Sequence, residues 1–224
     1  MDILTTLSRR AKQIYQTEGL RSLIRRGFAF LAYCLFERQT YYLYADRTEG
    51  FLSLHEADFK PSIDGFILKV VSSNEEADEL EAEGFQFRSH VQNSQQRLDK
   101  GAVAFCIFVG SELAHIAWAA LSKEAQSSIG EPPYKVDFSN REGCTGDIWT
   151  NSEYRRMGLS SYVYTRRLRF MLNNGIVTNR TVANKRNVIS QQYSAKVDSN
   201  MCGEGRYLRV LWWKSWKETP LSLD

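Results

Sequence analysis

Along most of the chain, short apolar runs that are typical of strands alternate with segments in which apolar residues recur at helical spacing. Apolar runs at 65–73 (GFILKVVSS), 102–109 (AVAFCIFV) and 112–121 (ELAHIAWAAL) predict strands. Between the first two, residues 74–85 (NEEADELEAEGF) predict a helix that Asn74 caps and Gly84 ends. Gly110 and Ser111 separate the second and third runs by two residues, which indicates a hairpin of antiparallel strands.

The second half of the chain repeats this alternation. Residues 123–143 contain Gly130, Pro132 and Pro133, and therefore predict a loop. After it the pattern predicts a strand at 144–150, a helix at 158–174 closed by Gly175, a strand at 177–183, a helix at 184–197 and a strand at 205–213. Together with a short aromatic strand at 40–45, this order predicts an α/β fold (α+β, mixed sheet) built around one sheet.

Residues 1–50 differ in composition from the rest and form a predicted basic extension ahead of one domain at 51–224. Arginines and lysines alternate with leucines and isoleucines at helical spacing, and Gly19 divides the segment into two predicted helices. Such helices either pack their apolar face on the protein core or lie on an anionic membrane surface, here through residues 1–38. Both alternatives stay open at this point.

Composition narrows the classes of function. A hydrophobic content of 43% and a charged content of 25% predict a folded globular chain, and a net charge of +3 argues against a nucleic-acid binder. Four scattered cysteines form no CxxC pair, and three distant histidines show no metal-ligand spacing, so we expect a reducing cytoplasm and no metal. The longest apolar run, 27–36, is half of the roughly 20 residues that a membrane-spanning helix needs.

The junction YRRMGLSS at 154–161 is the most informative short stretch. It follows a predicted strand and opens a predicted helix, where backbone amides have no partner within the helix. Arg155 and Arg156 add positive charge, and Gly158 lets the backbone approach a ligand closely. The combination predicts a binding site for an anion, and pyrophosphate is a typical ligand of such a site.

This junction resembles the pyrophosphate loop of the GNAT superfamily of N-acetyltransferases, which has the form Arg/Gln-x-x-Gly-x-Gly/Ala between a strand and a helix. The resemblance covers about residues 66–213 in element order, with Ser160 where the family has glycine or alanine. It implies that backbone amides of the loop bind the pyrophosphate of acetyl-coenzyme A and that the strand edge before the loop pairs with the pantetheine arm. The implied loop residues are Arg155, Arg156, Met157, Gly158, Leu159 and Ser160, and the implied edge residues are Ile148, Trp149 and Thr150.

A second likeness to the family lies on the predicted helix at 184–197. Asn187 and Ser190 match an asparagine followed three residues later by a small residue on the cofactor side. The family often uses a tyrosine on this helix to protonate the leaving thiolate. Here Ser194 stands at that position, Tyr193 is its neighbour, and Asp198-Ser199 replaces the usual Gly-Phe. Tyr193 is the candidate acid.

Two residues are candidates for the base that takes the proton of the amine. Asp147 precedes the strand edge, and His115 lies on the neighbouring strand with an ordinary pKa suited to proton transfer. Each has a structural alternative, as an ion-pairing or hydrogen-bonded residue. Arg166, Arg167 and Arg169 are interpreted as a solvated helix face, Cys144 as a small buried residue, and the tryptophans as packing residues.

The resemblance therefore predicts an acetyl-coenzyme A-dependent N-acetyltransferase that acts on a small-molecule primary amine by direct attack. An amino sugar or nucleotide sugar is one expected acceptor, because the basic extension resembles GNAT proteins of bacterial surface-polysaccharide synthesis. The alternative is a non-catalytic coenzyme A-binding or interaction module at a membrane surface, and a third is an aminoacyl or peptidyl ligase on the same fold. The expected location is the cytoplasm or the inner face of the membrane, with a homodimer as one open oligomeric state.

Overall fold

The computed structural model describes residues 19–22, 24, 35–53, 56–91, 93–130 and 132–221. Eight strands form one mixed sheet in the order β2-β3-β4-β5-β6-β1-β7-β8, which confirms the predicted mixed α/β class. Contacts divide the chain into two compact units. The larger comprises Thr40–Gly205 with Glu218–Asp224, and the smaller comprises Met1–Gln39 with Arg206–Lys217.

Four antiparallel strands make up one half of the larger unit's sheet. They are β2 (Phe66–Val71), β3 (Val103–Val109), β4 (Glu112–Ala120) and β5 (Glu142–Thr150). The predicted hairpin joins β3 to β4, with Gly110 at a φ of 59° in its turn. Nearly every side chain of β3 and β4 is buried, because helices cover both faces of this part of the sheet.

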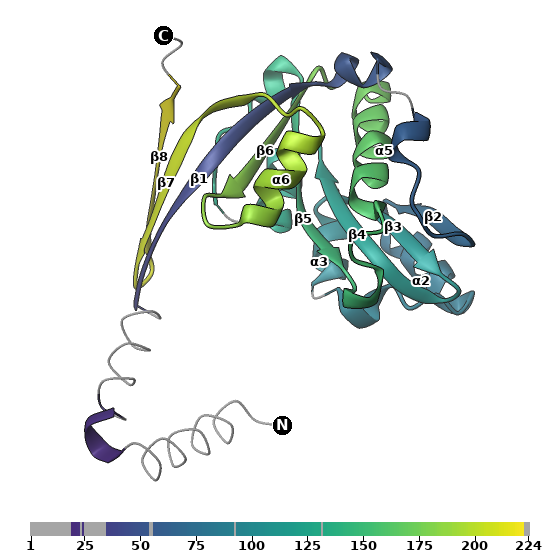
Figure 1. Ribbon diagram of the computed structural model, residues 1–224, viewed down its shortest axis with the longest axis horizontal. Coiled ribbons are helices and arrows are strands. Elements are labelled where there is room, and N and C mark those ends of the chain that lie inside the picture. Colours follow the sequence, from purple (N-terminus) through teal and green to yellow (C-terminus); the bar gives the residue numbers. More distant parts are fainter. Residues whose placement is uncertain are drawn as a thin grey trace. The chain divides into compact units, whose positions relative to one another are not determined.

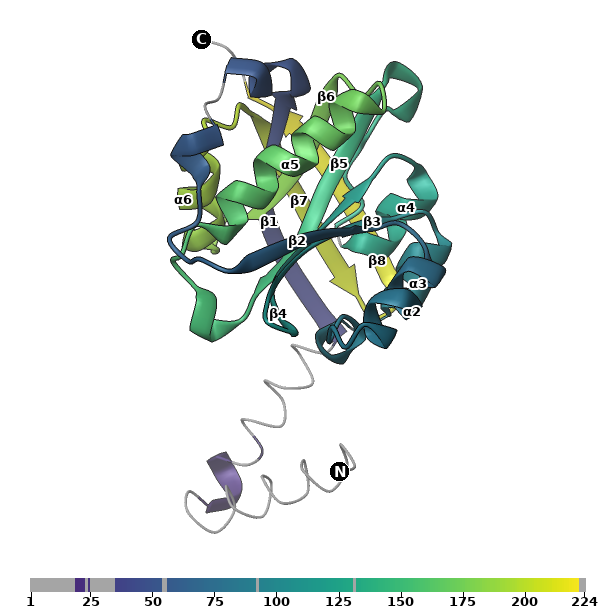
Figure 2. The ribbon, with the colours of Figure 1, turned by 90° about the vertical axis from the view of Figure 1, so that its right-hand side faces the viewer.

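One face of the sheet is covered by α5 (Leu159–Asn173), which crosses the strands in Figure 2. Its Leu159 and Val163 pack on Phe105 and Ile107 of β3. The opposite face packs against α2 (Asn74–Ala82), α3 (Ser94–Asp99) and α4 (Lys123–Ile129). Successive side chains of β3 point to opposite faces of the sheet, so they belong alternately to two separate hydrophobic clusters.

The other half of the sheet begins with β6 (Thr178–Asn184), which runs parallel to β5 and antiparallel to β1 (Phe36–Arg47). The helix α6 (Val188–Lys196) follows β6 and lies beside it in Figure 1. The chain then forms β7 (Met201–Val210) and β8 (Trp213–Pro220). The α5 and α6 predictions are confirmed, with Gly175 just after the end of α5.

Three expectations from the sequence are wrong in detail. The predicted loop at 123–143 begins with α4, because the Ser122 hydroxyl accepts a hydrogen bond from the Ala125 amide and starts a helix. The predicted last strand, 205–213, is the hairpin of β7 and β8, which turns at Leu211 and Trp212. The helix predicted at 74–85 is capped by Ser73 in place of Asn74.

Most of the predicted basic helices lie outside the described residues. The described residues of this segment before β1 are 19–22, 24 and 35, and these are helical. The domain boundary near residue 50 stays a prediction. Among the described residues, no helix is both long and apolar enough to cross a membrane.

Candidate functional site

The two central parallel strands separate partway along their length. The register of β5 and β6 begins at Glu142↔Thr178 and ends at Cys144↔Arg180, although both strands continue beyond it. On its other side β5 stays paired with β4, with a shift of register between Ile116 and Trp118. A bulge there places Asp147 at a φ of 43°. Beyond Cys144, β5 therefore has one edge that β6 does not occupy.

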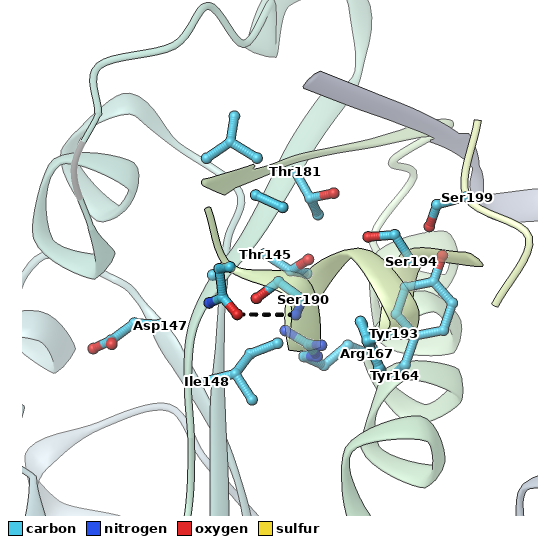
Figure 3. A pocket seen from close by; sticks show the side chains of 14 residues that line it. Thr145, Asp147, Ile148, Tyr164, Arg167, Thr181, Ser190, Tyr193, Ser194 and Ser199 are labelled. Carbon is cyan, nitrogen blue, oxygen red and sulfur yellow. Dashed lines mark hydrogen bonds between the residues drawn. The ribbon is translucent and has the colours of Figure 1, made fainter. Parts of the chain in front are cut away.

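A cavity of about 230 Å³ fills the opening between the separating strands. It is lined by the diverging parts of β5 and β6, by one side of α6 and by the middle of α5 (Figure 3). Hydroxyl groups dominate the polar lining, from Thr145, Thr181, Ser190, Ser194, Ser199, Tyr164 and Tyr193. A polar cleft bordered by an unpaired strand edge can bind a ligand that itself carries amides, by strand addition.

Arg167 supplies the cationic group of this cavity. The prediction that it belongs to a solvated helix face is wrong, because Arg167 is only 1% exposed. One guanidinium nitrogen donates to the Trp118 carbonyl at 3.3 Å, and Nε has no hydrogen-bond partner. Burial lowers the pKa of Arg167, partly opposed by the neighbouring Tyr193 and Tyr164 hydroxyls. The helical spacing from Val163 and Tyr164 to Leu168 and Met171 could have revealed this inward position.

The N-terminal half of α6 brings the second predicted motif to the cavity. Asn187 and Ser190 both line it, and the Asn187 side chain also caps the helix by accepting from the Ser190 amide at 3.1 Å. Tyr193 and Ser194 line it as well, so the one-residue offset keeps the tyrosine at the site. Burial raises the pKa of Tyr193 to about 12, against the lowering effect of Arg167. A phenol protonated at neutral pH can donate a proton or a hydrogen bond.

A buried carboxylate that the sequence did not indicate supports one end of the cavity. Asp46 of β1 is 8% exposed and accepts hydrogen bonds from Tyr164, Ser199 and the Asn200 amide at 2.9–3.0 Å. Burial raises the pKa of Asp46, and the three donors oppose that shift. Ser199 stands where the GNAT-like motif described above has phenylalanine. Its hydrogen bond to Asp46 links the segment just before β7 to β1.

The predicted pyrophosphate loop occupies the junction between β5 and α5. Gly158 has a φ of 80° and is the N-terminal cap of α5, with no side chain capping the helix. Arg156 also has a positive φ, of 67°, and both Arg155 and Arg156 are exposed. The Arg155 guanidinium donates to the Thr150 carbonyl at 3.3 Å. The first turn of α5 therefore presents uncapped amides and two cations to solvent.

A segment ahead of β2 packs against this loop and was not recognised in the sequence. The Ser62 amide donates to the Met157 carbonyl at 3.0 Å. A Cβ atom added at Gly158 would lie 3.6 Å from Cα of the buried Pro61. The exposed Lys60 is next to this contact and adds a third cation near the loop. Residues 60–62 carry no motif, so only the fold could place them here.

Asp147, the first candidate base, lies at the bulge of β5 and lines the cavity entrance. Its carboxylate forms an ion pair with Arg97 of α3 and is 44% exposed. Figure 3 shows this carboxylate pointing away from Arg167, Ser190 and Tyr193. The bulge thus turns Asp147 toward the α3 side, and its role as a base stays a prediction.

His115, the second candidate base, lies in the core of β4 and is fully buried. Its Nδ1 is 2.8 Å from the Thr150 hydroxyl, and Nε2 has no hydrogen-bond partner. Burial, together with the nearby charge of Arg167, lowers the pKa of His115 to about 3. The expectation of an ordinary histidine pKa is therefore wrong, and the role of His115 as a base stays a prediction.

The three predicted edge residues occupy different environments. Ile148 lines the cavity and is 43% exposed, whereas Trp149 and Thr150 pair with Ile116 and His115 of β4.

Cys144 is buried, and burial raises the pKa of its thiol to about 12, which makes it a poor nucleophile. Within the described part of the chain, no three His, Cys, Asp or Glu residues gather to hold a metal ion.

Known proteins resemble this chain in fold and not in sequence. No family model and no curated protein matches its sequence. A conserved protein of unknown function from Staphylococcus epidermidis is 13% identical, with a TM-score of 0.51 over 87% of this chain and 69% of that one. A Drosophila protein is 10% identical, with a TM-score of 0.51 over 84% of this chain and 56% of that one. These two likenesses show a shared fold.

A third structure carries a family description. It is a GCN5-related N-acetyltransferase-like protein from Streptococcus suis, 13% identical, with a TM-score of 0.48 over 91% of this chain and 69% of that one.

Proposed function

We propose that the protein is an acyl-coenzyme A-dependent N-acyltransferase of the GNAT type, with acetyl-coenzyme A as its simplest donor. The observation that supports this best is the continuity of one strand with two binding features. β5 carries the unpaired edge at Ile148 and then leads directly into the uncapped, cationic start of α5. A coenzyme A molecule has the matching order of groups, with pantetheine amides joined to a pyrophosphate.

In this proposal the first turn of α5, with Gly158 and the two loop arginines, binds the pyrophosphate. The edge of β5 pairs with the pantetheine amides and holds the thioester at the cavity. The amine then attacks the thioester carbonyl, so that a C–N bond forms and the C–S bond breaks. Asp147, directly or through water, takes the proton of the amine, and Tyr193 gives its proton to the departing sulfur. Holding both reactants in place supplies much of the acceleration.

The acceptor is a primary amine, and an amino sugar remains the proposed class on the basis of the sequence resemblance. The non-catalytic module would use the same coenzyme A site without turnover. Release of free thiol from acetyl-coenzyme A, measured with a panel of amines, separates the two. Amine-dependent release that Tyr193→Phe reduces supports the enzyme, whereas binding without release for the whole panel supports the module.

A further inference from the structure

The cavity contains a positive charge that no carboxylate balances. Among the described residues, Arg167 forms no ion pair, and its Nε is a buried donor without a partner. A buried cation is costly unless it is paired, so a ligand that supplies the counter-charge would remove this cost. Arg167 both lines the cavity and is 99% buried, so its unbalanced charge faces the ligand space.

The other groups around the cavity reinforce this positive character. Its acidic lining residue, Asp147, is paired with Arg97 and points away (Figure 3). Asp46 lies behind Tyr164 and already accepts three hydrogen bonds. The N-terminus of α6 faces the cavity through Asn187 and Ser190, and its helix dipole adds partial positive charge.

We propose that the ligand of this cavity carries a carboxylate, which Arg167 binds together with the hydroxyl of Ser190. The inference rests on the proposed acyltransferase function and narrows its substrates. The planar guanidinium suits a carboxylate because it can donate two parallel hydrogen bonds. Two sources fit: the far end of a dicarboxylic acyl group on coenzyme A, or the carboxylate of an amino-acid acceptor.

Matched pairs of ligands test this. For the donor, calorimetry compares the affinities of succinyl- and acetyl-coenzyme A. For the acceptor, it compares the affinities of α-amino acids and of the corresponding carboxamides for the protein with acetyl-coenzyme A bound. The carboxylate member of one pair should bind at least about tenfold more tightly, as expected for a charge-assisted hydrogen bond. Arg167→Gln should remove that preference, and Arg167→Lys should keep part of it. The matched control is Arg169→Gln, an exposed arginine on the same helix, which should change nothing.

The pair that shows the preference identifies the source. No preference for the carboxylate in either pair with the unsubstituted protein overturns the inference, and this result does not depend on whether a variant folds. A preference that persists in folded Arg167→Gln overturns it as well. In both cases acetyl-coenzyme A still binds, whereas failure of the acyltransferase proposal appears as no binding of any coenzyme A ester.

A second, independent feature lies in the smaller unit, at the turn between β7 and β8. Trp212 is 86% exposed, Trp213 is 55% exposed, and Leu211 occupies the turn with a φ of 56°. This conformation favours glycine or asparagine in two-residue hairpins, so an apolar residue here is held at an energetic cost. The prediction that these tryptophans serve as packing residues is wrong for Trp212.

The hairpin segment Arg206–Lys217 contains four basic residues and no acidic one. Arg209 is paired with Glu37 at 2.8 Å, and Arg206, Lys214 and Lys217 are exposed. Tryptophan rings flanked by basic side chains are typical of surfaces that enter the headgroup region of anionic membranes. A symmetric contact with a second copy would oppose like charges.

We infer that this hairpin tip docks on an anionic lipid bilayer. The test is co-sedimentation of the full chain with vesicles of phosphatidylcholine, with and without 30% phosphatidylglycerol. Binding should require the anionic lipid and weaken in high salt, and Trp212→Ser should lower the affinity by about tenfold, because a large aromatic surface is lost. Ile67→Ser, at an exposed strand position of the larger unit, is the control. Equal binding of Trp212→Ser and the unsubstituted chain overturns the inference, as does self-association without vesicle binding.

Discussion

The carboxylate of Asp147 and the guanidinium of Arg97 form an ion pair that joins the bulge of β5 to α3. Arg97 also lies 5.1 Å from the ring centroid of Trp118, so its position is fixed by a cation–π contact. The candidate base is therefore held by the face of the sheet opposite α5. Asp147 lines the cavity, yet its carboxylate points toward α3 and away from Arg167 and Tyr193, as expected if the amine approaches from the α3 side.

Asp147→Asn tests the role of this carboxylate. Asparagine tolerates the positive φ at position 147, and a partly exposed ion pair contributes at most about 1 kcal/mol, so the fold should persist. Binding of acetyl-coenzyme A should be unchanged, and kcat/KM for the amine should fall by about 100-fold or more. An unchanged kcat/KM would exclude Asp147 as the base.

Asp46 should make stability depend on pH. Its pKa is raised in the folded state, so the folded protein binds more protons than the unfolded chain between the ordinary aspartate pKa and the raised value. The contribution of Asp46 to the free energy of unfolding is therefore fully present at low pH and is lost as the pH rises through the raised pKa. Urea unfolding from pH 4 to 7 should show the unsubstituted protein losing stability relative to Asp46→Asn. A constant difference would contradict this.

Cys106 and Cys144 should resist thiol reagents in the folded protein. Burial raises the pKa of both thiols, that of Cys144 to about 12, so almost no thiolate is present at pH 8. Peptide mapping after iodoacetamide treatment should find both unmodified in native buffer and both modified in guanidinium chloride. Modification of Cys144 in native buffer at the rate of a free thiol would show that the core opens there.

Two buried glycines should differ in their tolerance of a methyl group. A Cβ atom at Gly203 would lie 2.7 Å from the Thr219 carbonyl oxygen, which belongs to the backbone of β8. At Gly143 the nearest atom, at 2.6 Å, is the terminal methyl of Met171, which can rotate away. Overpacking costs about 1–3 kcal/mol, so Gly203→Ala should lie at or above the upper end and Gly143→Ala near the lower. The reverse order in urea unfolding would contradict this account.

The features that the sequence predicts correctly are those whose conformation is determined by neighbouring residues in the chain. The helix start at Gly158 and the hairpin at Gly110 follow from glycine positions and apolar spacing. For Arg167, the position on the apolar side of α5 outweighs the charge, which by itself predicts a solvated side chain. Asp46 meets Ser199 only through the pairing of strands far apart in the chain, which no local pattern encodes. The sequence does not predict the exposed position of Trp212, because its turn contains no glycine, asparagine, aspartate, serine or proline.

The central claim is that β5 and the start of α5 form one coenzyme A site, and calorimetry with acetyl-coenzyme A tests it most directly. The unsubstituted chain is compared with Gly158→Asn, because asparagine tolerates the φ of 80° there, yet its side chain would extend toward the backbone of Lys60 and Pro61 and so displace the loop amides. The proposal predicts micromolar binding that weakens by at least about 30-fold in Gly158→Asn, since several amide contacts are lost. No binding to the unsubstituted chain, or equal binding to both proteins, would contradict it.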